Sequence, residues 1–385
     1  LDFLSSHTWP PAVDWTGADV INVKSLDVTV PGYVGAKIAS YGGDNAKGDN
    51  TGDDYPAFLA AINYAAANGK RVFVPVGQYP FNSPLTLASN TVLFGLHRSY
   101  SVLKANDAMA GVPPTDFGDG DVTPLVRTLD DAANNHTTKL ADLALLQRMT
   151  AANTYLIDWN AGAQSVVQNV NLNRQTVNAS KFAGTITNMN IPLIKIGNNG
   201  GGRWYSMFHL SGGNTGPSYR NLRIEGASSR ALKFYMFNPE LDAGATYNAE
   251  ITGRTNLDVF GSKAEGRHTP FVRLSNCVDV RWFGFGGNAY CNKNVDGSNN
   301  PLPFADSQAV IEIEDCYSIL LSSSSFHPNF LNPEGVPATD PLKFYRLKER
   351  TVNDFGTTIY KTTPGHLGFV FFRRDPGNTG INDDN

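Results

Sequence analysis

The sequence predicts an all-β protein, a single-stranded right-handed parallel β-helix in which short strands stack as successive coils of a solenoid. Pairs of apolar residues two positions apart recur along the chain, flanked by Asn, Asp, Ser or Gly. One segment nearly repeats, because Phe260-Gly261 returns 23 residues later as Phe283-Gly284. Short strands bounded by turns at a period in the twenties are typical of solenoids. Alternation by two, not by 3.6, excludes helical repeats.

The apolar pairs mark the expected strands. They are Val92/Phe94, Leu143/Leu145, Val170/Leu172, Leu222/Ile224, Leu257/Val259, Val280/Trp282 and Ile319/Leu321. Spacings of 51 and 52 residues between neighbouring pairs are interpreted as two coils each. Spacings of 35 and 39 are interpreted as one coil that carries a loop insertion. The chain of 385 residues is thus expected to form one solenoid without a second domain.

Four segments make up the expected domain organisation. Residues 1–34 form an N-terminal extension, and residues 35–385 form the β-helix. A helix over 54–68 covers the open end of the solenoid, which would otherwise expose apolar side chains and strand edges. Residues 105–139, rich in Pro, Gly and Asp, are expected to form a loop excursion over a binding groove.

Turn and cap residues predict that helix. Asp53 or Asp54 serves as the N-cap, Pro56 stands in the first turn, and Gly69 ends the helix. Both aspartates are therefore assigned a structural role.

Composition excludes several classes of partner. The net charge is −4 and no basic run occurs, so a nucleic-acid partner is not expected. No stretch of about 18 apolar residues exists, so no membrane span is expected.

Cys277, Cys291 and Cys316 lack the spacing of a zinc site and are expected to be buried thiols. Cys277 and Cys316 are expected to align as a core pair or a disulfide. No metal site is predicted, although calcium is left open.

Two stretches resemble a known family. "GAKIASYGGDNAKGDNTGDDYPAFLAAINYAAANGKRVFVPVGQYPFNSPLTLASNTVLFG" is similar to the entry segment of the pectate-lyase-like β-helix superfamily. "YNAEITGRTNLDVFGSKAEG" with "FGFGGNA" resembles secreted glycoside-hydrolase-related members of the β-1,3-glucanase and polygalacturonase type. The Asn-Thr-Asp, Asp-Asp and Gly-His-Gly pattern of polygalacturonases is missing. The resemblance implies a secreted, extracellular enzyme that acts on polysaccharides.

Glutamates are the candidate catalytic residues. Glycoside hydrolysis needs two carboxyl groups, one protonated and one ionised. Glu265, Glu240 and Glu250 cluster in the least regular region of the repeat. Glu250 has an alternative role as the ion-pair partner of Arg273 on the sheet surface, because alternation sends Glu250, Arg273 and Glu312 outward as one ladder.

Aromatic and polar residues are the candidate substrate-binding set. Stacking Phe260 over Phe283 and Ser322 aligns the following turns. Flat rings contact the C–H faces of sugars, and charged or amide groups contact the hydroxyls. Trp282, inward by register, is expected to pack in the core. The candidate set is Arg203, Trp204, Tyr205, Tyr235, Arg230, Arg267, Asn288 and His327, of which Arg230, Asn288 and His327 are expected to align with Glu265.

Two other functions stay open. A lyase acting on a uronic-acid polymer would use Lys233, Lys263, Arg267 and His268 as cations and base. Hydrolysis of a neutral glycan is preferred, because a chain at −4 offers little positive potential to a polyanion. A tailspike-like glycan-binding depolymerase is the third hypothesis, and it would form a trimer. A monomer without cofactor is expected for the preferred hydrolase.

Overall fold

The computed structural model describes most of the stacked strands and the connections between them. The described residues are 10, 13–17, 19–25, 45–106, 109, 123–147, 154–174, 192–206, 208–211, 219–240, 246–263, 270–286, 298, 300, 302–303, 307–323, 345–352, 358–364 and 369–373.

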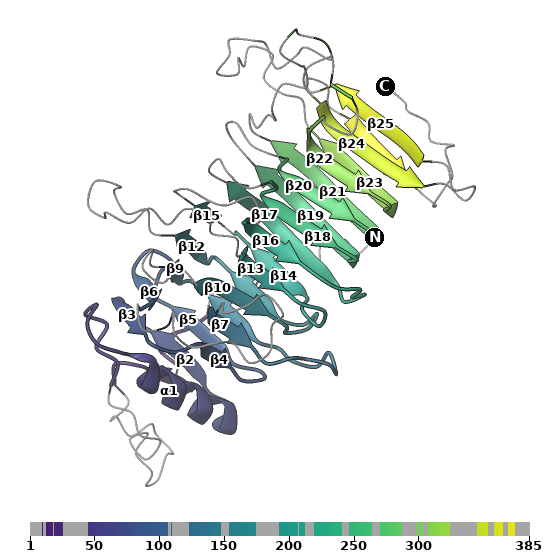
Figure 1. Ribbon diagram of the computed structural model, residues 1–385. Coiled ribbons are helices and arrows are strands. Elements are labelled where there is room, and N and C mark those ends of the chain that lie inside the picture. The colour runs from purple at the N-terminus through teal and green to yellow at the C-terminus, as the bar shows by residue number, and fades with distance from the viewer. Residues whose placement is uncertain are drawn as a thin grey trace.

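The chain forms a right-handed parallel β-helix with three faces, sheets A, B and C (Figure 1). Sheet A contains β1 (Val20–Asn22), β2 (Arg71–Val74), β5 (Val92–Gly95), β8 (Lys139–Ala141), β11 (Val166–Gln168), β14 (Gly202–Tyr205), β17 (Leu232–Glu240), β19 (Thr255–Lys263), β21 (Val278–Gly286), β23 (Tyr317–Ser323) and β26 (Phe369–Arg373). Sheet B contains β3 (Gly77–Phe81), β6 (Ser101–Ala105), β9 (Ala144–Gln147), β12 (Asn171–Arg174), β15 (Phe208–Ser211) and the second half of β17.

Sheet C completes each coil. It contains β4 (Leu85–Leu87), β7 (Thr123–Thr128), β10 (Thr154–Trp159), β13 (Pro192–Ile196), β16 (Arg220–Ile224), β18 (Ala249–Thr252), β20 (Val272–Ser275), β22 (Ala309–Glu314), β24 (Tyr345–Val352) and β25 (Thr358–Pro364). All neighbours are parallel except the last pairs, β23 with β26 and β24 with β25, which are antiparallel. The fold class predicted from the sequence is confirmed.

The 23-residue repeat corresponds to two adjacent coils. Val259 pairs with Trp282, and Phe260 pairs with Phe283, which in turn pairs with Ser322. Trp282 points inward as predicted and is only 1% exposed. Because side chains alternate across a strand, one face of each strand stays apolar while the other can vary.

The spacings of 51, 52 and 35 residues do not mark equivalent strands, and their interpretation was wrong. The spacing of 39 was interpreted correctly as one coil with an insertion, because Val280 pairs with Ile319. Leu222 lies in sheet C and pairs with Ala249, whereas Leu257 lies in sheet A and pairs with Leu232. The offset between β17 and β19 is therefore 25 residues, not 35. Arg230 precedes Leu232 by two positions, so this register extends to Thr255 at the start of β19, while Glu265 lies outside the described residues. An apolar pair shows that a strand is half-buried, but not to which sheet it belongs.

Single residues in the left-handed conformation form the bend between sheets A and B. Ser206, Met236, Gly261 and Gly284 occupy equivalent places after paired residues of β14, β17, β19 and β21, with φ of 50°, 58°, 68° and 74°. Gly adopts this conformation without cost, whereas a side chain is strained there. From β17 onward the strand continues through the bend, which joins sheets A and B.

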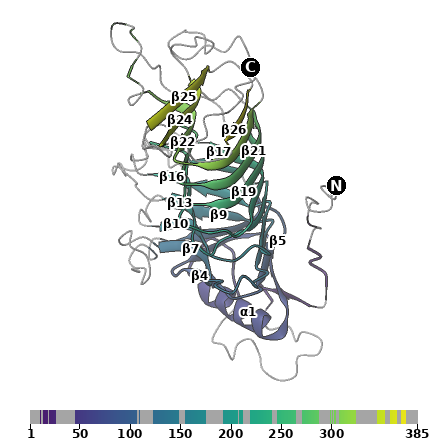
Figure 2. The same cartoon turned by 90° about the vertical axis from the view of Figure 1, so that its right-hand side faces the viewer.

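The predicted capping helix is confirmed as α1 (Tyr55–Asn68), which covers one end of the solenoid (Figure 2). Asp54 is the N-cap residue, but its side chain does not cap the helix. Its carboxylate instead accepts hydrogen bonds from the backbone N–H groups of Lys47, at 2.7 Å, and Gly48, at 3.2 Å. Gly69 ends the helix with a φ of 60°.

Two segment boundaries need correction. The loop excursion expected over 105–139 contains β7, a strand of sheet C, so it was drawn too long. The N-terminal extension expected over 1–34 contains β1, which pairs with β2 in sheet A. Both strands are short and carry no clear alternation, so the sequence pattern does not mark them.

Cys277 and Cys316 lie on adjacent coils as predicted, both as buried free thiols, while Cys291 lies outside the described residues. The backbone N–H of Cys277 donates to Cys316 Sγ at 3.2 Å. Within the described part of the chain, no helix has the length and apolar character to cross a membrane.

Candidate active site on sheet C

Charged side chains form one outward column along nearly the whole of sheet C. In register, the column consists of Arg127, Asp158, Lys195, Arg223, Glu250, Arg273, Glu312 and Lys348. The predicted ladder of Glu250, Arg273 and Glu312 is its central part. The alternating positions Ile251, Leu274 and Ile313 are buried, as expected. The column therefore places acids and bases at the strand spacing of about 4.8 Å.

Two arginines hold Glu250. Arg220 Nε donates to one carboxylate oxygen of Glu250 at 2.9 Å, and Arg273 Nη1 donates to the other at 3.3 Å. The Tyr247 ring lies beside both arginines, with its centroid 5.1 Å from Cζ of Arg220 and 5.4 Å from Cζ of Arg273. The predicted ion pair of Glu250 with Arg273 is thus present, and a second cation strengthens it.

Glu312 lies between Arg273 and Lys348 in the same column. Burial raises the pKa of its carboxyl group, against the attraction of Lys348. Its Oε1 accepts a hydrogen bond from the backbone N–H of Ala309 at 3.3 Å. Burial also raises the pKa of Tyr247 to about 12, helped by the negative charge of Glu312. Burial therefore favours the protonated form of Glu312.

A cleft of about 170 Å³ opens beside these groups. It is lined by Tyr247, Arg273, Glu312, Ile313, Glu314, Lys348 and Arg350. Glu314 bridges Arg273 and Arg350, and Arg350 Nη1 donates to it at 2.9 Å. Lys348 Nζ donates to the backbone oxygen of Ser307 at 2.7 Å. Three cations against two carboxyl groups give the lining a net positive charge, although Arg273 also pairs with Glu250 and Arg350 with Asp315 just outside it.

Asp158 is the third acid of the column and lies several coils away from the other two. It is 1% exposed, and Asn160 Nδ2 donates to it at 3.1 Å. Burial raises the pKa of Asp158 to about 6, partly opposed by Lys195. The folded state therefore binds a proton that the unfolded state releases at lower pH.

We expect Asp158→Asn to stabilise the fold at pH 7.5 by about 2 kcal/mol. The ionised carboxylate is penalised by burial, so this penalty develops as the pH rises from about 4 to about 6. Urea unfolding of the parent chain and of Asp158→Asn at pH 4.5 and 7.5 measures the difference in stability at each pH. The variant should lose part of the pH dependence, and equal stability changes at the two pH values would contradict the assignment.

Two predicted binding residues have structural roles instead. Trp204 is 0% exposed and packs against Trp159 and Phe234, with ring centroids 5.3 and 5.8 Å away. Trp204 pairs in register with Phe234, which is also buried, so both side chains lie on the inner face of sheet A. Arg230 donates to backbone oxygens of neighbouring turns, including those of Ala132 at 2.9 Å and Asn199 at 3.1 Å. The prediction of a substrate contact was wrong for Trp204, and these bonds give Arg230 a structural role.

The remaining candidates do not gather around Glu250. Arg203, Tyr205 and Tyr235 belong to sheet A, where Tyr205 stacks on Tyr235 with centroids 4.6 Å apart. Tyr205 is only 1% exposed, so the prediction of a substrate contact was wrong for it as well. Glu240 ends β17, and its backbone pairs with Leu210 in sheet B. On sheet A, Lys233 lies 3.8 Å from Asp258. The candidates Glu265, Arg267, His268, Asn288 and His327 lie outside the described residues.

Sequence reasoning missed several residues of the cleft. Tyr247 and Arg220 flank Glu250, and Glu314, Lys348 and Arg350 complete the lining. Alternation around Ile311 and Ile313 could have shown that Glu314 points outward with Glu312. No local pattern marks Tyr247, which precedes its strand. No group of three or more His, Cys, Asp or Glu suited to a metal occurs in the described ranges.

Comparison with known proteins links the chain to one family. The family described as "Rhamnogalacturonase A/epimerase, pectate lyase-like" matches residues 39–233. This segment is half of the chain and includes the capping helix and the first coils. The family is named for a rhamnogalacturonase and an epimerase. No protein of curated function matches the sequence.

Several solved structures are similar at low identity. The match to gene product 12 of bacteriophage phi29 covers 76% of this chain and 42% of the phage protein, with 15% identity and a TM-score of 0.38. The match to the A-module of an Azotobacter vinelandii mannuronan C-5 epimerase covers 73% of this chain and 84% of the module. The identity is 14% and the TM-score is 0.33. The match to a tailspike of an Acinetobacter phage covers 86% of this chain and 55% of the tailspike. The identity is 10% and the TM-score is 0.42. The chain thus spans less than two thirds of the two phage proteins.

Proposed function

Because the chain belongs to the rhamnogalacturonase A/epimerase, pectate lyase-like family, we propose that it cleaves a polysaccharide bound across the outer face of sheet C. The proposed reaction is glycoside hydrolysis by Glu312 and Glu250. One observation carries this proposal: burial raises the pKa of Glu312, while two arginines hold Glu250 on the same column. A carboxyl group whose pKa is raised by burial suits the acid of a glycosidase pair.

In this mechanism Glu312 donates its proton to the leaving glycosidic oxygen. Glu250 acts on the other side of the scissile bond and stabilises the positive charge that develops on the sugar ring. The two backbones are two strand spacings apart, about 10 Å. Side chains that project from backbones at this spacing have room for the roughly 6.5–9.5 Å between the carboxyl groups of inverting enzymes. Glu250 would therefore activate a water molecule as general base.

The proposed substrate is an acidic polysaccharide. Arg273, Lys348 and Arg350 line the cleft, and Arg220 lies behind Glu250. Guanidinium and ammonium groups at a water-accessible cleft attract carboxylate groups on a glycan. This proposal replaces the neutral glycan inferred from the net charge of −4. Extracellular action and a monomeric state are part of the proposal.

Elimination or epimerisation at a uronate is the second candidate. The same cations would neutralise the uronate carboxylate, and the family name includes an epimerase. A base must then remove the C5 proton. The pKa of Tyr247, about 12, works against a phenolate base at neutral pH, so Lys348 would have to serve. Hydrolysis is preferred because it uses the raised pKa of Glu312.

A panel of acidic and neutral polysaccharides, incubated with the chain in parallel with calcium and with a chelator, tests the proposal. We expect new reducing ends from an acidic polymer without a rise in absorbance from unsaturated uronates. An absorbance rise would establish elimination in place of hydrolysis. A changed ratio of C5 epimers without new ends would establish epimerisation. Reducing ends from neutral polymers alone would overturn the proposed substrate class. Size-exclusion chromatography of the same sample tests the monomer.

A further inference from the structure

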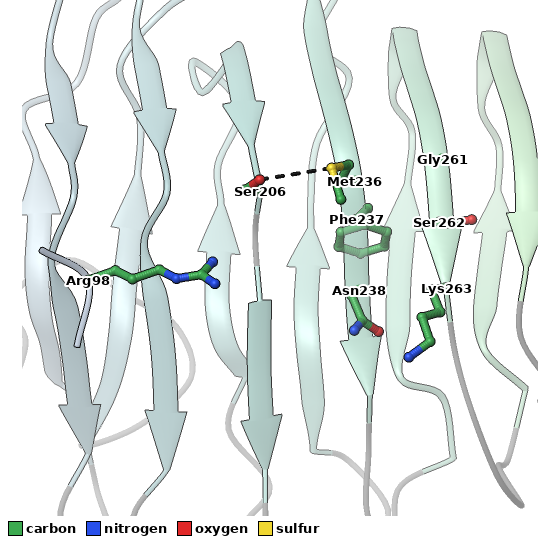
Figure 3. Close-up of a pocket in the computed structure, with 8 residues that line it drawn as sticks. All are labelled: Arg98, Ser206, Met236, Phe237, Asn238, Gly261, Ser262 and Lys263. Carbon is green, nitrogen blue, oxygen red and sulfur yellow. Dashed lines mark hydrogen bonds between the residues drawn. The ribbon is translucent and has the colours of Figure 1, made fainter. Parts of the chain in front are cut away.

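A second pocket lies at the bend between sheets A and B, away from the column on sheet C (Figure 3). Its volume is about 400 Å³. The lining comes from the segment after β5, from the end of β14 and from the bends of β17 and β19. Pockets of roughly 300–1,000 Å³ hold small ligands in proteins, so this one has room for a sugar residue. Nothing in the proposed hydrolysis uses it.

Two cations give the pocket its charge. Arg98 extends into it from one side, and Lys263 points toward it from the other, with the amide of Asn238 between them (Figure 3). Among the lining residues in the described part of the chain, none is a carboxylate. Arg98 also has no hydrogen-bond or ion-pair partner within the described ranges. A half-buried guanidinium in such a place favours an anionic ligand.

An apolar wall faces these cations. Met236 is 64% exposed and lines the pocket above the buried Phe237. Met236 has a φ of 58°, whereas Gly261 and Gly284 fill the equivalent positions of the next two coils. A bulky residue is strained in this conformation, and strain of this kind concentrates at binding sites. Strain and exposure together assign the methionine side chain a role in contacting a ligand.

We propose that this pocket is a non-catalytic subsite for one uronate residue of an acidic polysaccharide. The carboxylate lies between Arg98 and Lys263, a ring hydroxyl bonds to the amide of Asn238, and the C–H face of the sugar contacts Met236. The choice of an acidic sugar rests on the proposed function, while the charge and apolar wall of the pocket stand independently. Such a subsite would hold a polymer on the enzyme between cleavage events.

Methionine-methyl NMR tests the subsite directly. The chain has 5 methionines, and the signal of Met236 is identified by its loss in Met236→Leu. We expect this signal to shift saturably with glucuronate at low salt, but not with glucose. Arg98→Gln should weaken the affinity at least about tenfold, the loss typical of a hydrogen bond to a charged group. Lys70→Gln, which removes a cation next to the end of α1, should leave it unchanged.

Other results would overturn the subsite. These are an unmoved Met236 signal, equal shifts with glucose, equal affinity for acetate, or full affinity in Arg98→Gln that is still folded by circular dichroism. The outcome is separable from that of the hydrolase assay. Glu312→Gln should keep the Met236 shift, and a chain that cleaves polysaccharide without the shift would refute only the subsite.

Discussion

Replacing Glu312 by glutamine should lower the rate of polysaccharide cleavage by about 10²–10⁴-fold, the usual contribution of a general acid. Glutamine keeps the shape of the side chain but has no proton to give. Because burial favours the neutral form of Glu312, a neutral amide should be accommodated and the fold should persist. Reducing-end assays give the rate, and thermal unfolding gives the stability.

The pH dependence adds a second readout. In the parent chain, activity should fall as the pH rises through the pKa of Glu312, because the acid then loses its proton. Glu312→Gln should lack this alkaline decline. Glu250→Gln should also lose activity, since the base is removed while Arg220 and Arg273 remain without their carboxylate partner.

Glu225→Gln is the matched control. Glu225 borders the same column and lies 3.2 Å from Lys195 and 3.5 Å from Arg223, but it is remote from the cleft and partly exposed. Surface ion pairs contribute about 0–1 kcal/mol, so neither activity nor stability should change much. Full activity of Glu312→Gln with an unchanged pH profile would contradict the acid assignment. Glu240 and Glu265 would then be the carboxyl groups to replace next.

Truncating Trp282 to alanine should destabilise the fold by about 3–5 kcal/mol, as expected for a large core residue. Trp282 packs edge-on against Phe237 and Phe271, with centroids 6.1 and 6.2 Å away. Its Nε1 also donates to Ser262 Oγ at 2.8 Å, a bond that alanine cannot make. Urea unfolding followed by circular dichroism measures the change in midpoint.

Trp282→Phe is the control for shape. It keeps most of the apolar contact and loses the hydrogen bond, so we expect a smaller loss of about 1–2 kcal/mol. Arg281→Ala, on the outward side of the same strand, loses only its ion pair with Asp258. If Trp282→Ala is no less stable than Arg281→Ala, the inward packing of this coil does not determine stability.

The sequence by itself determined the fold class, the capping helix and the register of the later coils. Alternation by two is local, so it can be read along one strand: Leu257 and Val259 inward, Glu250 and Arg273 outward. Cap and stop residues are local as well, which is why α1 begins and ends next to Asp54 and Gly69. The repeat from Phe260 to Phe283 fixed the register because no insertion separates those coils.

Tertiary structure alone decided which residues share a surface. Trp204, Arg203 and Glu250 look equally available in the sequence, yet one is buried, one lies on sheet A and one lies on sheet C. The reason is that each coil visits three sheets, and loops of different length between them hide which strand returns to which face. The same geometry gathers Arg273, Lys348 and Arg350 in one cleft of a chain whose net charge is −4. Local charge therefore depends on the stacking of coils, which composition does not encode.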